Sequence, residues 1–267
     1  MKTVNLEQTW SECWRISYEF DRKEVYGDLS HPGYTYAYLN RKKYVLDLIK
    51  KILKPGQRIL DVAAGQGNFS LALAELDYEV TWNDIREELI GYVELKKEKG
   101  VIHYAPGNVF DLEFRSFFDL ILITEIIEHT AYPDEFLKKI ATMVKIGGYV
   151  VMTTPNGGYF LNSLPKFTKY PDPSKFQACQ FRPDADGHIF LPHYDEIAVW
   201  AEKASLSIDK IDLFTNPLTN GHLKTHYLLR WLPFSFIKKC EEFTAYLPLS
   251  VKKKILIHLG ALLRRSH

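Results

Sequence analysis

The chain has 267 residues, of which 46% are hydrophobic, so it is long enough to bury a continuous core. Lys and Arg number 34 against 33 Asp and Glu, and the net charge of +1 gives no global field that would attract nucleic acid or an anionic membrane. No stretch reaches the roughly 18 apolar residues of a membrane-spanning helix. The three cysteines lack metal-ligand spacing, which favours buried thiols and a cytoplasmic location.

Residues 1–40 are expected to form a helical cap. They are rich in Trp, Tyr and charge, and Gly27 and the run His31-Pro32-Gly33 are expected to stop this prelude. From Tyr44 to Leu53, apolar residues recur every three or four positions. This spacing predicts a helix that leads into the main domain, residues 41–215.

Strands and helices alternate after this helix. Each expected strand is a short β-branched run with a turn signal behind it, and a helical pattern separates most neighbouring strands. The alternation predicts an α/β fold with a doubly wound, mostly parallel sheet. The expected strands are Arg58–Val62, Glu79–Asn83, Val101–Tyr104, Asp119–Thr124 and Tyr149–Thr154, and the expected helices are Asn68–Leu76, Glu87–Glu98 and Asp134–Val144.

The remaining segments follow the last of these strands in the sequence. Residues 156–187 are polar and rich in proline, and a loop of that length predicts a lid over the site. A helix over Tyr194–Ala204 and a strand near Ile208–Phe214 would then close the sheet. Residues 216–267 are expected to form a helical extension that ends in a basic amphipathic helix, 251–266. That helix either docks on its own domain or contacts a membrane surface peripherally.

The first expected strand runs through Asp61 into a turn of small residues, Ala63-Ala64-Gly65-Gln66-Gly67, and then into a helix. Glycine lets the backbone approach a ligand, and a helix N-terminus presents free N–H groups. Alone, such a loop suits a dinucleotide, a nucleotide or an adenosylated cofactor. Asp61 favours a cationic ligand end, because a carboxylate beside the loop would repel a phosphate.

Polar residues also follow the next two strands. Asp84 ends the second strand, where an acidic side chain hydrogen-bonds ribose hydroxyls in doubly wound folds. After the third strand, Asn108 has an amide that suits an adenine edge, and Phe110 would pack against the ring. Each residue also has an interpretation as a turn or cap residue. Their shared position at strand ends favours a cofactor site.

The fourth strand ends in Thr124-Glu125-Ile126-Ile127-Glu128-His129, and His188 follows later in Asp186-Gly187-His188. Ligands bind at strand ends in open α/β sheets, so these side chains are expected to face a substrate cleft. Carboxylates and imidazoles there can accept protons or bind a divalent cation. The alternative is that Glu128 caps a helix and His129 packs on it.

Over residues 40–215 the chain resembles the class I S-adenosylmethionine-dependent methyltransferase superfamily. The loop Asp61–Asn68, Asp84 and Asn108 carry the resemblance, although the superfamily's first loop glycine is Ala63 here. The resemblance implies a seven-stranded sheet with an antiparallel last hairpin, the loop around the methionine part, Asp84 on the ribose and Asn108 near the adenine. The cofactor-binding residues expected on this basis are Asp61, Ala63, Gly65, Gly67, Asn68, Asp84, Ile85, Asn108, Val109, Phe110 and Glu125.

The motif Glu125-x-x-Glu128-His129 is similar to that of the ubiquinone-pathway O-methyltransferases and of the small-RNA 3′-terminal 2′-O-methyltransferases. In the latter, a motif of this kind and a later histidine hold a divalent metal, so Glu125, Glu128, His129 and His188 are the implied ligands of Mg²⁺ or Mn²⁺. The same resemblance implies O-methylation of a hydroxyl on a small molecule, such as a glycan, a quinone-type compound or a secondary metabolite. Glu128, His129 and His188 are then the expected catalytic residues.

Three other functions stay open at this point. A metal-dependent 2′-O-methyltransferase on RNA 3′ ends fits the motif, but the near-neutral charge makes nucleic acid an unlikely partner. A non-catalytic binding protein fits Ala63 and Ala64. A nicotinamide oxidoreductase fits less well, because Gly65-Gln66-Gly67 does not match the Gly-x-Gly-x-x-Gly spacing. The sequence does not indicate an oligomeric state.

Overall fold

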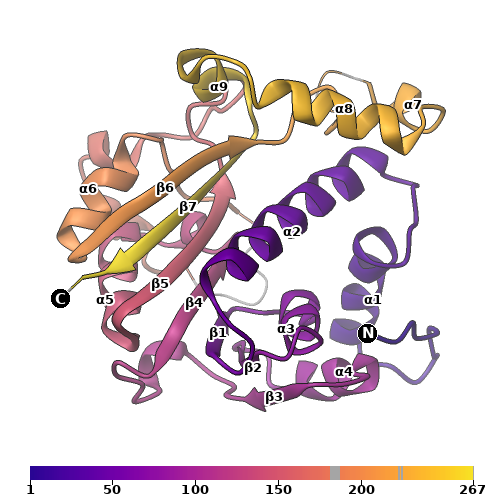
Figure 1. The fold of residues 1–267 in the computed structure, drawn as a ribbon, viewed down its shortest axis with the longest axis horizontal. Coiled ribbons are helices and arrows are strands. Elements are labelled where there is room, and N and C mark those ends of the chain that lie inside the picture. Colours follow the sequence, from indigo (N-terminus) through magenta and orange to yellow (C-terminus); the bar gives the residue numbers. More distant parts are fainter. Residues whose placement is uncertain (181–186, 222, 224, 267) are drawn as a thin grey trace. The chain divides into compact units, whose positions relative to one another are not determined.

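The computed structural model describes residues 1–180, 187–221, 223 and 225–266, and Figure 1 labels its elements. They fall into two compact units, which are described in turn. The first comprises Met1–Glu113 and Leu218–Leu232, and the second comprises Phe114–Pro217 and Pro233–His267. The domain boundaries expected at residues 40 and 215 do not coincide with these units and stay a prediction.

Three parallel strands form the sheet of the first unit. β1 (Arg58–Val62), β2 (Glu79–Asn83) and β3 (Val101–Tyr104) lie in the order β3-β2-β1, and their bounds are those that the sequence predicts. β1 and β2 pair in register along their whole length. Four of the five residues in each of these two strands are buried, which explains their nearly continuous apolar runs.

The junction between the first two helices differs from the prediction. α1 (Glu12–Glu24) is the expected cap helix, but α2 (Pro32–Ile52) begins inside the supposed stop. Proline suits the first turn of a helix, because its missing N–H has no intrahelical partner there. Gly33 is needed for close packing, since a Cβ atom at this position would lie 1.9 Å from the carbonyl oxygen of Asn220. The remaining helices of this unit are α3 (Asn68–Ala74), α4 (Leu89–Lys96), η1 (Val109–Asp111) and α7 (His226–Leu229).

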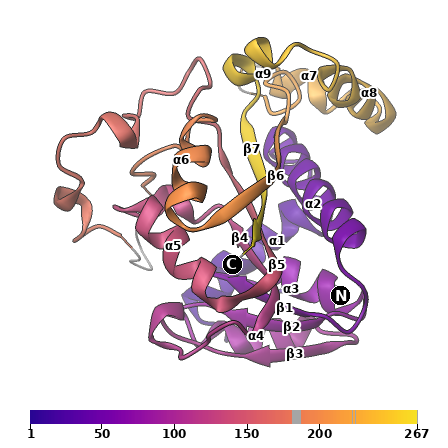
Figure 2. The ribbon, with the colours of Figure 1, turned by 60° about the vertical axis from the view of Figure 1, so that its left-hand side comes forward.

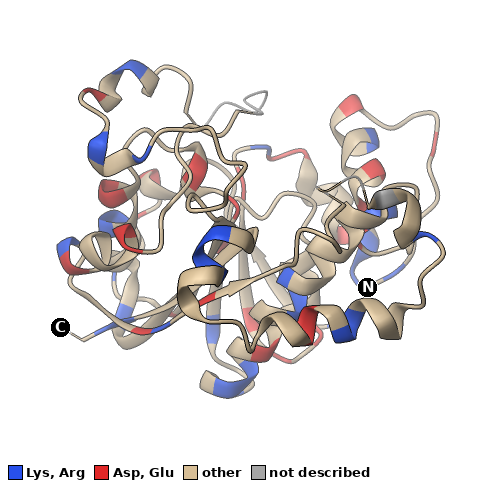
Figure 3. Cartoon of the chain, turned by 90° about the horizontal axis from the view of Figure 1, so that it is seen from above, with Lys and Arg blue, Asp and Glu red and all other residues tan. Residues whose placement is uncertain are grey.

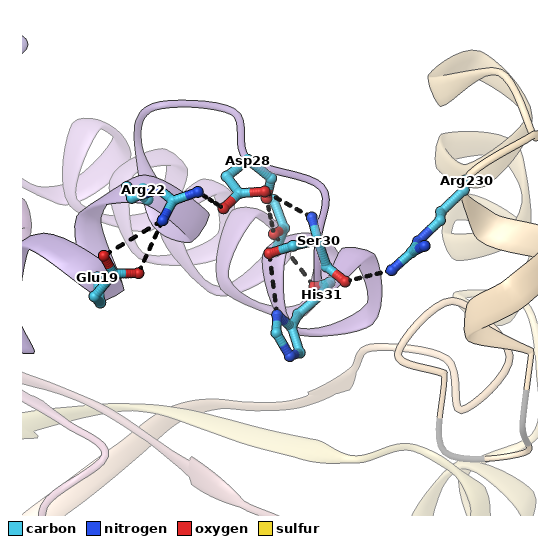
Figure 4. Close-up of polar contacts among 7 residues, drawn as sticks. Glu19, Arg22, Asp28, Ser30, His31 and Arg230 are labelled. Carbon is cyan, nitrogen blue, oxygen red and sulfur yellow. Dashed lines mark hydrogen bonds and ion pairs between the residues drawn. The ribbon is translucent and has the colours of Figure 1, made fainter.

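Polar contacts join the connection between α1 and α2 to the C-terminal segment of the first unit (Figure 4). Arg22 Nη2 pairs with Asp28 Oδ2 at 2.9 Å, and Ser30 N donates to Asp28 Oδ1 at 2.7 Å. Arg230 Nη2 donates to the carbonyl oxygen of Ser30 at 2.8 Å, across a sequence separation of 200 residues. The expected extension 216–267 is therefore divided between the two units.

The second unit contains four strands in the order β4-β5-β7-β6. β4 (Phe118–Thr124) and β5 (Val144–Pro155) are parallel, whereas β7 (His258–Arg265) is antiparallel to β5 and to β6 (Leu206–Phe214). The helices of this unit are η2 (Ile127–His129), α5 (Pro133–Met143), η3 (Phe167–Lys169), η4 (Pro173–Phe176), α6 (Glu196–Lys203), α8 (Phe234–Thr244) and α9 (Leu249–Ile255).

The prediction of a basic amphipathic helix over 251–266 is wrong. α9 ends at Ile255, and residues 258–265 form the central antiparallel strand of the second unit. The first six residues of β7 are all buried, on both faces of the strand. A strand buried on both faces is a continuous apolar run, which periodicity alone does not distinguish from a helix.

The segment 156–187 has more structure than a simple loop. In Figure 2, the described part of this segment extends outward beside α6. The rings of Phe167 and Phe176 lie 5.3 and 5.4 Å from that of Phe190, and Thr168 N donates to Glu196 Oε1 of α6 at 2.8 Å. Residues 181–186 lie outside the described residues, and the expected role as a lid stays a prediction.

The sheet order β3-β2-β1-β4-β5-β7-β6 gives seven strands. The β1–β2, β2–β3 and β4–β5 pairs are parallel, and the β5–β7 and β6–β7 pairs are antiparallel. The predicted fold class is confirmed, including the antiparallel last pair.

Charges of both signs are mixed along the helices and loops (Figure 3). Within the described ranges, no helix combines the length and apolar character needed to span a membrane. Cys13, Cys179 and Cys240 are all described and free of disulfides. None of the three is buried, so the expectation of buried thiols is wrong.

Candidate functional site

The loop after β1 turns sharply because three of its residues have positive φ angles. These are Ala63 at 52°, Gly65 at 54° and Gly67 at 75°. Ala64 N donates to the carbonyl oxygen of Asn83 at 2.8 Å, which ties the loop to the end of β2. A left-handed conformation costs alanine about 1–2 kcal/mol, and such strain is typical of functional sites. Ala63 thus adopts the conformation for which glycine is better suited.

Asp61 lies at the base of this loop and is 1% exposed. Its Oδ2 accepts a hydrogen bond from Ser70 Oγ at 2.6 Å, whereas Oδ1 has no hydrogen-bond partner among the described residues. Burial raises the pKa of this carboxyl from 3.8 to about 7, and the hydrogen bonds from Ser70 only partly oppose the shift. A buried carboxylate oxygen without a donor fits a ligand that carries a positively charged donor, such as an ammonium group.

Asp84 follows β2, is 2% exposed and accepts four hydrogen bonds. Gly65 N and Arg86 Nη2 donate to Oδ2 at 2.8 and 3.1 Å. Arg86 N and Arg86 Nε both donate to Oδ1 at 2.9 Å. Asp84 therefore positions the glycine loop directly. Four donors match the lone-pair sites of a carboxylate, so ribose hydroxyls would have to displace the Arg86 guanidinium.

The turn after β3 carries the remaining polar candidate of this unit. Asn108 Oδ1 accepts from Phe110 N at 3.1 Å and so caps η1, which is the alternative that the sequence left open. Val109 is buried, Phe110 is half-buried and Ile85 is exposed. Asn83, which the sequence analysis did not single out, holds the turn by donating from Nδ2 to the Gly107 carbonyl oxygen at 2.9 Å.

The side chain of Asn68 is hydrogen-bonded to α1 and α4, and its expected role in cofactor binding stays a prediction. Its side chain, 4% exposed, contacts Asp21 and Glu24 of α1 and Lys96 of α4. Gln66 Nε2 also donates to Glu24 Oε2, at 3.0 Å. No motif marked the three charged residues, because they lie far from the loop in sequence and belong to helices with ordinary patterns.

The second unit brings three of the predicted polar residues together at the end of β4. One ligand atom from each of Glu128, His129 and His188 lies within 4.8 Å of the others. Glu128 is buried, His129 is half-buried and His188 is exposed, so the cluster runs from the interior to the surface. Thr154 Oγ1 donates to Glu128 Oε2 at 3.0 Å. Two imidazoles and one carboxylate are a donor set that suits either proton transfer or a divalent cation.

Backbone contacts hold the two ends of this cluster in place. The amide of Ile189 donates to the carbonyl oxygen of Glu128 at 2.7 Å. His129 Nδ1 lies 3.2 Å from the carbonyl oxygen of Gly187. Because a carbonyl oxygen only accepts, Nδ1 donates this hydrogen bond, and in the neutral imidazole the lone pair is then on Nε2.

Glu125 does not join this cluster. Its φ angle is 52°, Thr153 Oγ1 donates to its Oε1 at 3.0 Å, and its Oε2 lies 3.8 Å from His258 Nε2. His258 is 6% exposed and stacks on Phe214 at a centroid distance of 5.6 Å. This histidine was not predicted as a site residue, because residue 258 was expected to lie in a helix. The prediction that Glu125 shares one metal site with the other three residues is not supported by their positions.

Comparison with known proteins identifies the family of the chain. Residues 36–211 match the family model described as a methyltransferase domain. The ubiquinone biosynthesis O-methyltransferase of Pseudomonas syringae pv. tomato is 31% identical over 184 residues, which cover 62% of this chain and 72% of that protein. The enzyme of the same name from Proteus mirabilis is 29% identical over 182 residues, 62% of this chain and 67% of that protein.

Solved structures share the fold. A methyltransferase dependent on S-adenosylmethionine from Archaeoglobus fulgidus aligns with a TM-score of 0.55 and 18% identity, over 92% of this chain and 98% of that one. The phosphoethanolamine N-methyltransferase 2 of Haemonchus contortus, in complex with S-adenosylmethionine, aligns with a TM-score of 0.54 and 20% identity, over 84% of this chain and 53% of that one. The chain belongs to the methyltransferase domain family and is an S-adenosylmethionine-dependent methyltransferase.

Proposed function

We propose that this enzyme methylates a hydroxyl oxygen of a small molecule, such as a glycan, a quinone-type compound or a secondary metabolite. The cluster of Glu128, His129 and His188 is the observation that carries this proposal. A hydroxyl must lose its proton as the methyl group arrives, so it needs a proton acceptor. The names of the curated relatives, which are O-methyltransferases, support the same acceptor class.

We propose that the first unit binds the cofactor. S-adenosylmethionine, when bound, supplies a methyl group on a sulfonium sulfur that is open to in-line displacement. Asp61 would accept a hydrogen bond from the cofactor's ammonium group, and Asp84 from the ribose hydroxyls. Ala63, Gly65 and Gly67 shape the loop, while Ile85, Asn108, Val109 and Phe110 would line the adenine end. Asn68 supports the loop from behind rather than contacting the cofactor.

Within the cluster, the exposed imidazole of His188 and the half-buried one of His129 are the groups that an acceptor hydroxyl can reach. In the neutral imidazole of His129, the hydrogen bond from Nδ1 leaves Nε2 as the nitrogen that can accept a proton. Glu128 lies behind them, buried, and its carboxylate stabilises an imidazolium once the proton has moved. His129 and His188 would therefore act as the accessible bases, and Glu128 as their buried counter-charge.

Binding of a divalent cation by the same three side chains is an alternative to direct proton acceptance by the imidazoles. Two imidazole nitrogens and a carboxylate oxygen match the ligand preferences of several divalent metals, Mn²⁺ among them. When bound, such an ion supplies Lewis acidity that lowers the pKa of a hydroxyl. Glu125 is not included in this proposed site, because it pairs with His258.

The test is a methyl-transfer assay with labelled S-adenosylmethionine and a panel of acceptors. The panel contains catechols, simple phenols, sugars with free hydroxyls, primary amines and an RNA oligonucleotide with a free 3′ end. We expect product with at least one class of hydroxyl and none with the amines. EDTA treatment followed by Mg²⁺ or Mn²⁺ separates a metal-dependent reaction from one that uses the imidazoles alone. Transfer to amines only would contradict the proposal, and transfer to RNA only would select the alternative.

The pH dependence of cofactor binding tests the role of Asp61. Its pKa of about 7 lies above the ordinary 3.8, so the free protein loses stability from this group as the pH rises through that interval. A cationic ligand favours the ionised form, so binding below pH 7 releases a proton. We expect affinity for S-adenosylmethionine to rise with pH up to about 7 and then level off. Calorimetry at pH 6 in two buffers of different ionisation enthalpy measures the released proton, and Asp61→Asn should abolish it. A proton release unchanged in this variant would remove Asp61 from the site.

A further inference from the structure

A buried polar network connects α1 to the loop between β1 and α3. Asp21 of α1 and Lys96 of α4 are both 0% exposed, and Lys96 Nζ donates to Asp21 Oδ2 at 2.6 Å. Tyr92 OH donates to the same oxygen at 2.7 Å. Glu24, one turn further along α1, accepts from Tyr34 OH at 2.6 Å. Asp and Lys side chains are mostly exposed in proteins, so the full burial of Asp21 and Lys96 requires an explanation.

Asn68 is the point at which this network meets the loop. Its Nδ2 donates to Asp21 Oδ1 at 2.7 Å and to Glu24 Oε2 at 2.9 Å, and its Oδ1 accepts from Lys96 Nζ at 2.9 Å. Both amide hydrogens are thereby used. Gln66, two residues earlier, adds a hydrogen bond to Glu24. Side chains of α1 and α4 therefore hold the loop through Gln66 and Asn68.

The other end of α1 is fixed to α4 as well. Trp14 Nε1 donates to the carbonyl oxygen of Glu88 at 2.8 Å, and Ser11 Oγ donates to Glu88 Oε2 at 3.0 Å. A Cβ atom on Gly91 would lie 2.7 Å from the ring of Trp14, so the two helices approach as closely as glycine allows. Contacts near both ends of α1 thus hold the helix against α4.

We propose that α1 is a positioning element for the cofactor: the buried Asp21–Lys96–Asn68 network sets the conformation of residues 63–68 and thereby the affinity for S-adenosylmethionine. The inference rests on the proposed cofactor site. Asp21 and Lys96 are positioning residues, because they act on the cofactor only through Asn68 and the loop. The network limits the loop's freedom before binding, so less ordering remains to be done when the cofactor arrives.

The polar groups of the network fix the orientation of the side chains that they contact, which apolar groups would not do. A buried ion pair adds little net stability compared with apolar residues of similar size, but it fixes the orientation of the groups that it contacts. Burial lowers the pKa of the Lys96 ammonium, and the adjacent Asp21 carboxylate opposes that shift. An apolar substitute would pack as well and would leave the Asn68 amide, and with it the loop, without a defined direction.

The experiment uses the full chain with S-adenosylmethionine and its demethylated product, S-adenosylhomocysteine, as probes in calorimetry. Asp21→Asn is expected to weaken binding of both by about tenfold, the effect of losing a hydrogen bond to a charged group. The two losses should be equal, because loop position does not depend on the sulfonium charge. Lys96→Met should act similarly, and the double variant should be no weaker than either single one, because the residues act as one unit.

Two further measurements distinguish positioning from simple stability. In the free protein, the amides of Ala64, Gly65 and Gly67 should exchange hydrogen faster in Asp21→Asn, while those of the β5 strand stay unchanged. The KM for S-adenosylmethionine should rise with little change in kcat. Glu19→Gln is the matched control, since Glu19 lies on the same helix in an exposed pair with Arg22 and should leave binding and exchange unchanged.

Wild-type affinity and wild-type loop exchange in a folded Asp21→Asn variant would overturn the inference, even if the melting temperature fell. Should that variant fail to fold, Tyr92→Phe removes a single hydrogen bond to Asp21 and decides the question by the same two readouts. A wild-type protein that binds neither probe would refute the proposed cofactor site. In that case the exchange rates of the loop would still show whether the network positions it.

Discussion

Replacing Glu128 by glutamine is expected to reduce kcat by about 100-fold, the contribution typical of a general acid–base group. Glutamine keeps the shape of the side chain and a partner for Thr154 Oγ1, so the buried site should stay folded. It removes the negative charge behind the imidazoles of His129 and His188, which lies within 4.8 Å of both. Steady-state rates with saturating cofactor measure the loss, and the dissociation constant of S-adenosylmethionine should not change.

Glu135→Gln provides the control for this variant. Glu135 lies on α5 in the same unit and is exposed, so its loss removes an acid of the same type without touching the cluster. Full turnover in Glu128→Gln would exclude Glu128 from catalysis, both as a counter-charge and as a metal ligand. A loss of cofactor affinity of similar size would instead indicate that the substitution disturbs the fold.

The largest effect on cofactor binding is expected from Asp84→Ala, which should weaken the affinity for S-adenosylmethionine by about 10- to 100-fold. The substitution removes the proposed acceptor for the ribose hydroxyls. It also removes the acceptor of Gly65 N, at 2.8 Å, so the glycine loop loses one of its anchors. Calorimetry measures the affinity, and kcat at saturating cofactor should change much less.

Two companion variants sharpen this prediction. Arg86→Gln removes the guanidinium that occupies both oxygens of Asp84 and leaves the carboxylate, so it should strengthen binding or leave it unchanged. Asp77→Asn removes an exposed acid after α3 and should have no effect, since asparagine tolerates the φ angle of 64° at that position. If Asp84→Ala bound as tightly as the wild type, the ribose assignment would be wrong.

The parts of the fold that could be predicted are those with clear local sequence signals. β1, β2 and β3 have the predicted bounds because each is a short apolar run between strong turn signals. The prediction failed where local signals were ambiguous. Pro32 is compatible both with the end of one helix and with the first turn of the next. The apolar run of β7 resembles that of a buried helix, because the strand is buried on both faces.

The candidate site shows the same division. Position at strand ends was sufficient to single out Asp61, Asp84, Glu128 and His129, because the carboxyl ends of parallel strands are where such sheets bind ligands. The sequence could not indicate which polar groups already have partners. Arg86 on Asp84, and His258 beside Glu125, became visible only in the folded chain.

By itself, the sequence determined the order of the elements, the glycine loop and the acids beside it, since all of these depend on neighbouring residues in the chain. Only the tertiary structure decided that His188 joins Glu128 and His129, that β7 enters the sheet, and that α1 supports the loop through Asp21 and Asn68. These contacts join residues that lie from 47 to 115 positions apart in the sequence. Such contacts depend on how packed helices and strands meet rather than on any local pattern.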